Sequence, residues 1–382
     1  MRARRAIYLD WNAGSPLATS VAAGLASLNS ESSLSASQLE GSFLLLQGNP
    51  SSTHAFGRRL RAQMNEAREK VALSLGLPPS RAEEIHFCSS GTEANQLPLQ
   101  LFLRDARVWA LGQADHPCVR AGSEEFRRRG GRVIALPVDP QGRTRVDDLP
   151  EGIDVLSLLW VNNETGSVLD LAVAVSAARS RGVKWIHVDG AQAWGKIAVD
   201  LGSLGVDAVS FSGPKIGALA GSGLFWMSQQ ARAEMRGKHP WPGRQESGMR
   251  PGTENILNVA ALGWAAAEVA SHTWSTQCGL LKTDVIARLR ASIPQIVFNA
   301  GSDQPAALAN TLNFRVPGSE KPGWVAALDL RGFAVSAGSA CSAGAEQPSH
   351  VLLACGLTEA QARASVRVSW GPKTLAADLD AW

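Results

Sequence analysis

The sequence predicts an α/β fold in which a mainly parallel, seven-stranded sheet is followed by a smaller α+β region. Two observations lead to this fold class. Short apolar runs and helical patterns alternate between about residues 58 and 280, and the last hundred residues have a different rhythm. Strands that alternate with helices favour a mainly parallel sheet covered on both faces. With 382 residues, 45% of them hydrophobic and 19% charged, the chain can fill more than one core.

Seven apolar runs have the length of buried strands. They lie at residues 84–88, 107–111, 132–136, 155–160, 183–188, 206–211 and 223–227. One helical pattern covers 59–75, where Leu60, Met64 and Val71 share a face, and another covers 171–181, with Gly182 as a left-handed cap. Ligands of such sheets bind beyond the carboxyl ends of the strands, so we expect the site in the loops there.

The end of the chain predicts a second domain. A helix near 278–291 and strands near 310–316 and 364–370 stand among glycine-rich loops. We therefore expect residues 16–262 to form a large domain, and residues 1–15 with 263–382 to form a small α+β domain. Residues 27–42 are rich in serine and are expected to form a mobile or surface segment.

Composition argues against several classes of protein. The net charge of +3 does not call for nucleic acid or an anionic membrane as a partner. No run approaches the roughly 18 apolar residues of a membrane span, and the basic residues 2–5 lead into no apolar signal segment. The five cysteines are isolated and odd in number, which disfavours disulfides and a zinc site. Isolated thiols favour a reducing, cytoplasmic environment.

The segment 89–95, Ser-Ser-Gly-Thr-Glu-Ala-Asn, follows a predicted strand and opens a helix. Its small residues would let backbone N–H groups and hydroxyls approach a phosphate at the positive end of that helix. An ordinary capped helix start, Ser or Thr followed by Glu, explains the same residues. On this segment alone, both interpretations stay open.

Two predicted strands end in residues that suit a ring or carbonyl ligand. Asp189 follows the run 183–188, where a carboxylate could pair with a protonated ring nitrogen or could simply cap the next helix. Lys215 follows the run 206–211, in Ser-Gly-Pro-Lys-Ile. A lysine beside a ligand can have its pKa lowered enough to form a Schiff base, although most lysines in loops are merely solvated.

Cys341 differs from the other cysteines. Cys88 and Cys355 follow apolar runs, as buried thiols do. Cys341 lies in Ser-Ala-Gly-Ser-Ala-Cys-Ser-Ala-Gly, residues 336–344, which has no apolar periodicity and predicts an exposed, mobile loop. An exposed thiol is available to attack, and an incidental surface cysteine is the alternative.

These motifs resemble the cysteine desulfurases, in particular the NifS/IscS-like group within the class V aminotransferase family of fold-type I pyridoxal-phosphate (PLP) enzymes. The likeness runs over nearly the whole chain, from Ile-Tyr-Leu-Asp-Trp-Asn at 7–12 to Val-Arg-Val-Ser-Trp-Gly at 366–371. Between these ends it includes the segments 48–54, 90–95, 161–166, 187–189, 245–246, 250–255, 338–341 and 348–351. So many motifs in order make chance agreement negligible.

The resemblance implies that PLP is the cofactor and that its phosphate has a defined set of ligands. Gly91, Thr92 and Ser212 would cradle the phosphate. Thr253 would reach it from the partner subunit of a homodimer. Fold-type I enzymes also have a large PLP-binding domain and a smaller one, as the pattern of elements predicts.

The resemblance also assigns residues to the cofactor ring. Lys215 would hold PLP covalently, and Asp189 would pair with its pyridinium nitrogen. Gln192 would hydrogen-bond the phenolic oxygen. His116 would stack on the ring and help to move protons.

The implied activity is removal of sulfur from L-cysteine, which gives L-alanine and a persulfide on Cys341. Asn163, which also belongs to the cofactor pocket, and Arg367 would hold the substrate carboxylate. Lys215 would take the Cα proton before the Cys341 thiolate attacks the substrate sulfur. A sulfur-acceptor protein or scaffold would then receive the sulfur, with iron–sulfur cluster assembly as the expected use and thiolated tRNA or molybdenum cofactor left open. No membrane or direct nucleic-acid partner is implied.

Two other interpretations compete with this one. A related PLP lyase or aminotransferase, such as selenocysteine lyase, would need no persulfide and would tolerate Cys341→Ser. A non-catalytic dimeric scaffold of the same fold would bind no cofactor. Pro214 favours the scaffold, because the family usually has a histidine before the lysine. Retention of Lys215, Asp189 and Cys341 together argues against it.

Overall fold

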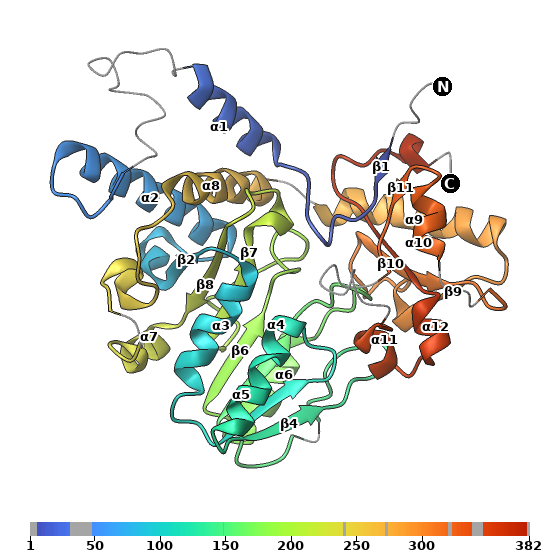
Figure 1. Ribbon diagram of the computed structural model, residues 1–382, viewed down its shortest axis with the longest axis horizontal. Helices are drawn as coiled ribbons and strands as arrows, with labels where there is room; N and C mark the ends of the chain where they lie inside the picture. The colour runs from blue at the N-terminus through green and yellow to red at the C-terminus, as the bar shows by residue number, and fades with distance from the viewer. Residues whose placement is uncertain are drawn as a thin grey trace. The chain divides into compact units, whose positions relative to one another are not determined.

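The computed structural model describes residues 6–30, 48–147, 149–239, 242–271, 274–319, 323–337 and 347–379. Their contacts divide them into two compact units, whose helices and strands are labelled in Figure 1. Unit 1 contains the described residues of Met1–Ser15, Arg107–Lys184 and Thr273–Trp382, and unit 2 contains those of Pro16–Ala106 and Trp185–His272. The predicted division into residues 16–262 and a smaller remainder groups the chain differently and stays a prediction.

Unit 2 is built on four strands in the order β2-β8-β7-β6. They are β2 (Ile85–Cys88), β6 (Trp185–Asp189), β7 (Ala208–Ser212) and β8 (Gly223–Met227). β6 and β7 are parallel, whereas β8 runs antiparallel to both β7 and β2. A parallel pair needs a crossover of roughly a dozen residues or more. The connection 213–222 is shorter than that, so the chain reverses direction between β7 and β8.

Helices and short 3₁₀ turns surround these strands in unit 2. The helices are α1 (Thr19–Ser30), α2 (Ala55–Ser74), α3 (Gly91–Phe102), α7 (Gln229–Met235) and α8 (Ile256–Ser271), and the turns are η3 (Pro79–Glu84), η4 (Gly213–Ile216) and η5 (Gln245–Gly248). α3 packs against β7 and β8, while α8 packs against α1 and α2 (Figure 1). The pattern predicted over 59–75 is confirmed, because Leu60, Met64 and Val71 are buried on one face of α2.

Unit 1 contains three parallel strands in the order β5-β3-β4, together with two small sheets. The parallel strands are β3 (Val108–Gly112), β4 (Arg132–Leu136) and β5 (Val155–Leu159). An antiparallel sheet has the order β12-β10-β9, and β1 pairs with β11. Their bounds are β1 (Ile7–Tyr8), β9 (Val297–Phe298), β10 (Thr311–Arg315), β11 (Phe333–Ala334) and β12 (Val366–Ser369).

The helices of unit 1 are mostly short. They are α4 (Pro117–Arg120), α5 (Gly122–Arg128), α6 (Leu171–Ser180), α9 (Trp274–Ser292), α10 (Trp324–Asp329), α11 (His350–Ala354) and α12 (Glu359–Arg363), with 3₁₀ turns η6 (Asn299–Gly301) and η8 (Ala376–Leu379). α6 and α9 confirm the helices predicted at 171–181 and 278–291. Gly182 follows α6 with a φ of +73°, as its predicted role of left-handed cap requires.

The predicted fold class is confirmed. Each of the seven predicted strands corresponds to a strand among the described residues, and β4 and β8 begin and end where the sequence places them. β6 and β8 are buried along their whole length, as strands covered on both faces must be. Of the serine-rich segment 27–42, residues 27–30 end α1, and residues 31–42 lie outside the described residues.

Candidate active site

The carboxyl ends of β6 and β7 bring Asp189 and Lys215 to one edge of unit 2. The two strands are parallel neighbours in which Asp189 lies opposite Ser210. Asp189 is the last residue of β6, and Lys215 lies in η4, which begins directly after β7. Gly217 ends this turn with a φ of +80°, and a Cβ there would lie 2.6 Å from the Ala18 nitrogen. Only glycine fits, so the path of the chain after the lysine is fixed.

The Asp189 carboxylate is buried and held on both oxygens. Asn95 Nδ2 donates to Oδ2 at 3.1 Å, and the backbone N–H of Ala191 donates to Oδ1 at 3.0 Å. The side chain is 4% exposed. A buried carboxylate is costly unless it is paired and hydrogen-bonded. Its geometry is compatible with a protonated ring nitrogen as a partner, and that role stays a prediction. Asn95 is a residue that the sequence did not single out.

The start of α3 lies in close contact with the end of β7 and the beginning of β8. A Cβ on Gly91 would lie 2.9 Å from Ser212 Cβ, and a Cβ on Gly223 would lie 2.4 Å from the Ser90 carbonyl. Real Cβ atoms do not approach so closely, so both positions require glycine. The exposed Thr92 follows Gly91 at the helix N-terminus, where backbone N–H groups attract an anion.

The helix-cap interpretation of this segment is confirmed, whereas the phosphate interpretation stays a prediction. Ser90 is the N-cap of α3, and its hydroxyl accepts the Glu93 N–H at 3.1 Å. Glu93 Oε2 in turn accepts the Ser89 N–H at 2.5 Å. The cap and the phosphate cradle are compatible, because the cap leaves Gly91 and Thr92 at the helix N-terminus. This glycine-lined cradle and the buried Asp189 fit the phosphate and the ring nitrogen of PLP.

Arg250 connects the segment 250–255 to the start of α3. Its Nε donates to Glu93 Oε1 at 3.0 Å. Burial raises the pKa of Glu93, but the hydrogen bonds from Ser89 and Arg250 outweigh it and hold that pKa below its usual value. Thr253 is exposed and lines a cavity of about 220 Å³ together with Ser89 and Gly223.

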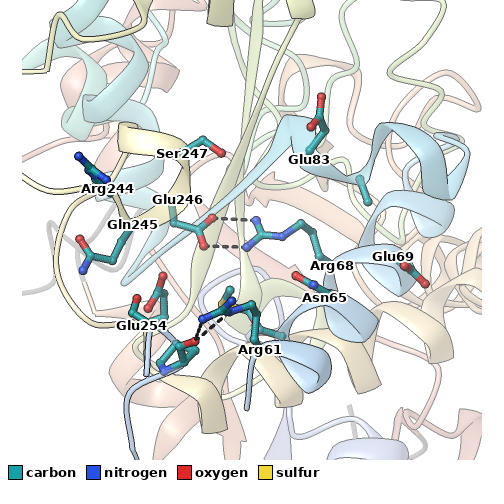
Figure 2. Close-up of a pocket in the computed structure, with 14 residues that line it drawn as sticks. Arg61, Asn65, Arg68, Glu69, Glu83, Arg244, Gln245, Glu246, Ser247 and Glu254 are labelled. Atoms are coloured by element: carbon teal, nitrogen blue, oxygen red, sulfur yellow. Dashed lines mark hydrogen bonds and ion pairs between the residues drawn. The ribbon is translucent and has the colours of Figure 1, made fainter. Parts of the chain in front are cut away.

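A larger cavity of unit 2, of about 510 Å³, collects motifs that lie far apart in the sequence (Figure 2). Pro50 and Ser51 of the segment 48–54 line it together with Gln245 and Glu254. Arg61 projects toward Pro50, whose carbonyl accepts its Nε at 2.9 Å. Three of the segments that carried the family resemblance, 48–54, 245–246 and 250–255, thus line one cavity.

A buried ion pair fixes the wall of this cavity. Arg68 Nη1 and Nη2 donate to the two oxygens of Glu246 at 2.8 and 2.7 Å (Figure 2), and the Phe87 N–H donates to Glu246 Oε2 at 2.8 Å. Arg68 and these bonds hold the pKa of Glu246 below its usual value despite burial, which raises it. Glu246 and Ser247 have φ of +48° and +58°, a strained backbone that the buried pair stabilises.

Gln192 lies in the turn after β6, with its side chain buried. Lys196 Nζ, also buried, donates to Gln192 Oε1. This contact orients the amide so that its nitrogen is the group that can donate to a phenolic oxygen. Sequence reasoning named Gln192 but not Lys196, which is four residues away.

Arg367 of β12 is buried in unit 1 and already held by two acceptors. Its Nη2 donates to Asp10 Oδ1 at 2.5 Å and its Nη1 to the Asn163 carbonyl at 3.1 Å. Its Nε has no hydrogen-bond partner among the described residues. Asn12 Nδ2 also donates to the Asn163 carbonyl, at 3.2 Å. A guanidinium oriented in this way suits the predicted role of Arg367 in binding a carboxylate.

His116 is the N-cap of α4 in unit 1. Its Nδ1 accepts the Cys118 N–H at 3.2 Å and lies 2.9 Å from Cys118 Sγ. The preceding residue, Asp115, is buried, and its carbonyl lies 3.1 Å from His350 Nε2. Sequence reasoning assigned no role to Cys118 or Asp10.

The predicted site residues fall into three groups. Unit 2 contains Gly91, Thr92, Asp189, Gln192, Ser212, Lys215 and Thr253. Unit 1 contains His116, Asn163 and Arg367. Cys341 lies outside the described residues.

Two thiols that the structure describes, those of Cys88 and Cys355, are poorly suited to attack a substrate. Cys88 and Cys355 are partly rather than fully buried. Burial still raises the pKa of Cys355 to about 12, and it raises that of Cys88 as well. Thiols that stay protonated are poor nucleophiles.

Within the described ranges, no group of three or more His, Cys, Asp or Glu side chains could hold a metal ion. No helix that the structure describes is long and apolar enough to span a membrane.

Comparisons with known proteins identify the family of the chain. Residues 35–382 match the family model of class-V aminotransferases. The chain is 33% identical over 352 residues to an IscS-like cysteine desulfurase of Mycobacterium tuberculosis, covering 87% of each protein. It is 30% identical over 345 residues to the cysteine desulfurase NifS of Azotobacter vinelandii, covering 87% of this chain and 83% of that protein.

Solved structures agree with the sequence comparisons. A NifS-like protein from Rickettsia africae superposes with a TM-score of 0.81 at 25% identity, over 99% of this chain and 97% of the other. DndA from Streptomyces lividans superposes with a TM-score of 0.69 at 29% identity, over 85% of this chain and 92% of the other. The chain therefore belongs to the class-V aminotransferase family, among its PLP-dependent cysteine desulfurases.

Proposed function

We propose that this enzyme removes sulfur from L-cysteine with Lys215 as the anchor of PLP and Cys341 as the acceptor of sulfur. The observation that carries the proposal is the arrangement at one edge of unit 2. The buried Asp189 and the lysine turn η4 stand at the carboxyl ends of two neighbouring parallel strands. The glycine-lined start of α3 lies against the end of the second strand.

The residues of unit 2 would hold PLP by complementary contacts. Gly91, Thr92 and Ser212 would bind the phosphate at the N-terminus of α3. The Asp189 carboxylate would keep a proton on the ring nitrogen, and Lys215 would hold the cofactor covalently. When bound, PLP supplies an electron sink for the negative charge that develops at the substrate Cα.

Other residues would bind the substrate and move its protons. Arg367 would bind the carboxylate of L-cysteine, and its orientation is set beforehand by Asp10 and the Asn163 carbonyl. The Lys215 amine would take the Cα proton. His116 would carry a proton at Nε2, because its Nδ1 already accepts the Cys118 N–H.

The sulfur transfer balances without a further reactant. The Cys341 thiolate attacks the substrate Sγ, an S–S bond forms and the Sγ–Cβ bond breaks. The electron pair of the broken bond goes to Cβ, which takes up a proton. Cα regains the proton that Lys215 had taken, and the product is L-alanine. A sulfur acceptor then receives the outer sulfur from Cys341. We include in the proposal that this sulfur is used to assemble iron–sulfur clusters.

The proposal includes a homodimer in the cytoplasm. The exposed Thr253 supports the dimer, because its predicted role is to reach the phosphate of a partner subunit. Among the described residues, Cys88, Cys118, Cys278 and Cys355 form no disulfide, which supports a reducing compartment. Sedimentation of the PLP-loaded enzyme tests the dimer, and a Thr253→Val variant should weaken PLP binding while leaving the dimer intact.

Anaerobic incubation with L-cysteine tests the activity. The enzyme should form alanine and protein persulfide in equal amounts during the first turnover. Cys341→Ala should bind L-cysteine but form no persulfide, and Lys215→Ala should lose the absorbance band of covalently bound PLP. Continued turnover by Cys341→Ser would instead favour a lyase that needs no persulfide. A colourless wild-type protein would favour the scaffold.

A further inference from the structure

His116 and Cys118 form a close side-chain pair at the start of α4. His116 is the N-cap residue, and its Nδ1 accepts the backbone N–H of Cys118 at 3.2 Å. Cys118 Sγ lies 2.9 Å from the same nitrogen. Both side chains are partly buried. One residue therefore brings its backbone N–H and its thiol to a single ring nitrogen.

The backbone contact fixes the roles of the two ring nitrogens. A neutral imidazole has one nitrogen that donates and one that accepts. A backbone N–H is only a donor, so the nitrogen that faces it must be the acceptor. Nδ1 therefore has no proton in this arrangement, and the proton of the neutral ring is on Nε2. The thiol adds a second potential donor to the same acceptor.

We propose that Cys118 is a positioning residue for His116. The Cys118 thiol donates to Nδ1 of His116 and favours the neutral ring with its proton on Nε2. The inference rests on the proposed role of His116 in moving protons during desulfuration. Cys118 acts through the ring of His116. The Cys118 thiol keeps its proton, so the proposal includes no covalent or redox step.

Other charged and titratable groups surround the pair. Arg120 ends α4, the buried Asp115 precedes His116, and His350 of α11 lies with its Nε2 3.1 Å from the Asp115 carbonyl. Burial lowers the pKa of His350, Arg120 and His116 lower it further, and the contact with Asp115 raises it. Titration of His116 must therefore be assigned separately from that of His350.

Nitrogen NMR of the PLP-loaded enzyme with ¹⁵N-labelled histidine tests the pair directly. In the wild type, His116 should show an unprotonated Nδ1 and a protonated Nε2. Cys118→Ala keeps the backbone N–H and therefore the tautomer, but it should make His116 titrate at higher pH, because a donor to the neutral form is lost. Cys118→Ser should restore the wild-type spectrum, because a hydroxyl also donates. His116→Gln and His350→Gln assign the two resonances.

A matched control is available in the same unit. Cys355→Ala removes another partly buried thiol and should leave the His116 resonances unchanged. Two outcomes would overturn the inference. An unchanged titration of His116 in Cys118→Ala would show that the thiol is incidental. Titration of His116 at lower pH in that variant would show that the pair is a thiolate beside an imidazolium.

Kinetics separate this inference from the proposed function. Cys118→Ala should lower kcat about fivefold, the effect of one hydrogen bond of about 1 kcal/mol. It should also shift the pH profile of kcat, and it should have no further effect in a His116→Gln background. If the wild type forms no alanine from L-cysteine, the proposed function fails, and the spectra still decide the pair. If the wild type is active and the spectra do not change, only the inference fails.

Discussion

Two buried charged side chains of the candidate site are held by hydrogen-bonding partners. Asp189 has Asn95 and the Ala191 N–H, and Arg367 has Asp10. Removal of one partner from such a group costs more than a surface contact, because the remaining charge loses its hydrogen bonds in a poorly solvated place. Substitutions at these residues should therefore affect binding more than surface substitutions do.

Asp189→Asn should leave the fold intact and weaken catalysis. The amide keeps the size of the side chain but lacks the charge that would hold a proton on the cofactor ring. A hydrogen bond to a charged group contributes about 1.5–3 kcal/mol, so kcat/KM should fall about 10- to 150-fold. Steady-state kinetics measures this, with thermal unfolding as the check on the fold. Unchanged kcat/KM would contradict the role of Asp189.

Gly91→Ala should weaken PLP binding more than it weakens the fold. The new Cβ would lie 2.9 Å from Ser212 Cβ, at the place proposed for the phosphate. Overpacking of this kind costs about 1–3 kcal/mol. Equilibrium titration of the apoenzyme with PLP measures the loss. Gly279→Ala, in α9, is the matched control: its Cβ would meet only Ala309 Cβ, at 4.0 Å, and PLP affinity should not change.

At the scale of elements, local sequence patterns predicted where the strands lie but not whether neighbouring strands run parallel or antiparallel. The bounds of β4 and β8 follow from apolar runs between polar flanks. Such a run is the same in a parallel and an antiparallel strand, so the reversal of β8 was not predictable from it. Asp189 and Lys215 were predictable because strand ends are visible in sequence. The Asp10–Arg367 pair was not, because 357 residues separate its members.

The contact between α3 and the segment 250–255 yields a prediction at this scale. Arg250 and Glu93 are both about one-quarter exposed, and their atoms lie 3.0 Å apart. A double-mutant cycle with Glu93→Gln and Arg250→Gln should give a coupling of about 0.5–1 kcal/mol in PLP binding. The coupling should disappear as pH falls through the lowered pKa of Glu93. Additive effects at neutral pH would contradict the connection. The exposed pair Lys70–Glu66 is the control.

At the scale of the whole molecule, buried titratable groups shape the dependence of stability on pH. Burial lowers the pKa of Lys282 to about 8, and Asp303 raises it by less. Between about pH 8 and 10.5 the unfolded chain holds a proton that the folded chain has lost, so stability rises with pH there. Lys282→Met should flatten this rise, as measured by urea unfolding at several pH values. Lys70→Met, on the surface, should not.

At acid pH, stability again rises with pH, but a different residue is responsible. Burial lowers the pKa of His187 to about 3, and the ring is held by Ser210 at 3.0 Å. Between about pH 6.5 and 3 the unfolded state binds a proton that the folded state does not, so stability falls as pH falls. His187→Gln should make the decline shallower. An identical slope in the variant would show that other groups cause the acid instability.

The reversal between β7 and β8 has a consequence for how the protein folds. Two strands joined by the short connection 213–222 form a pair of low sequence separation, which closes quickly, within about 1–10 μs for a hairpin. The pairing of β2 with β8 must instead bring residues 85–88 to 223–227 across a long intervening chain. The turn that carries Lys215 therefore lies inside the region expected to form first. The loop of the proposed PLP lysine should therefore be closed by strands that pair on both sides of it before β2 joins the sheet.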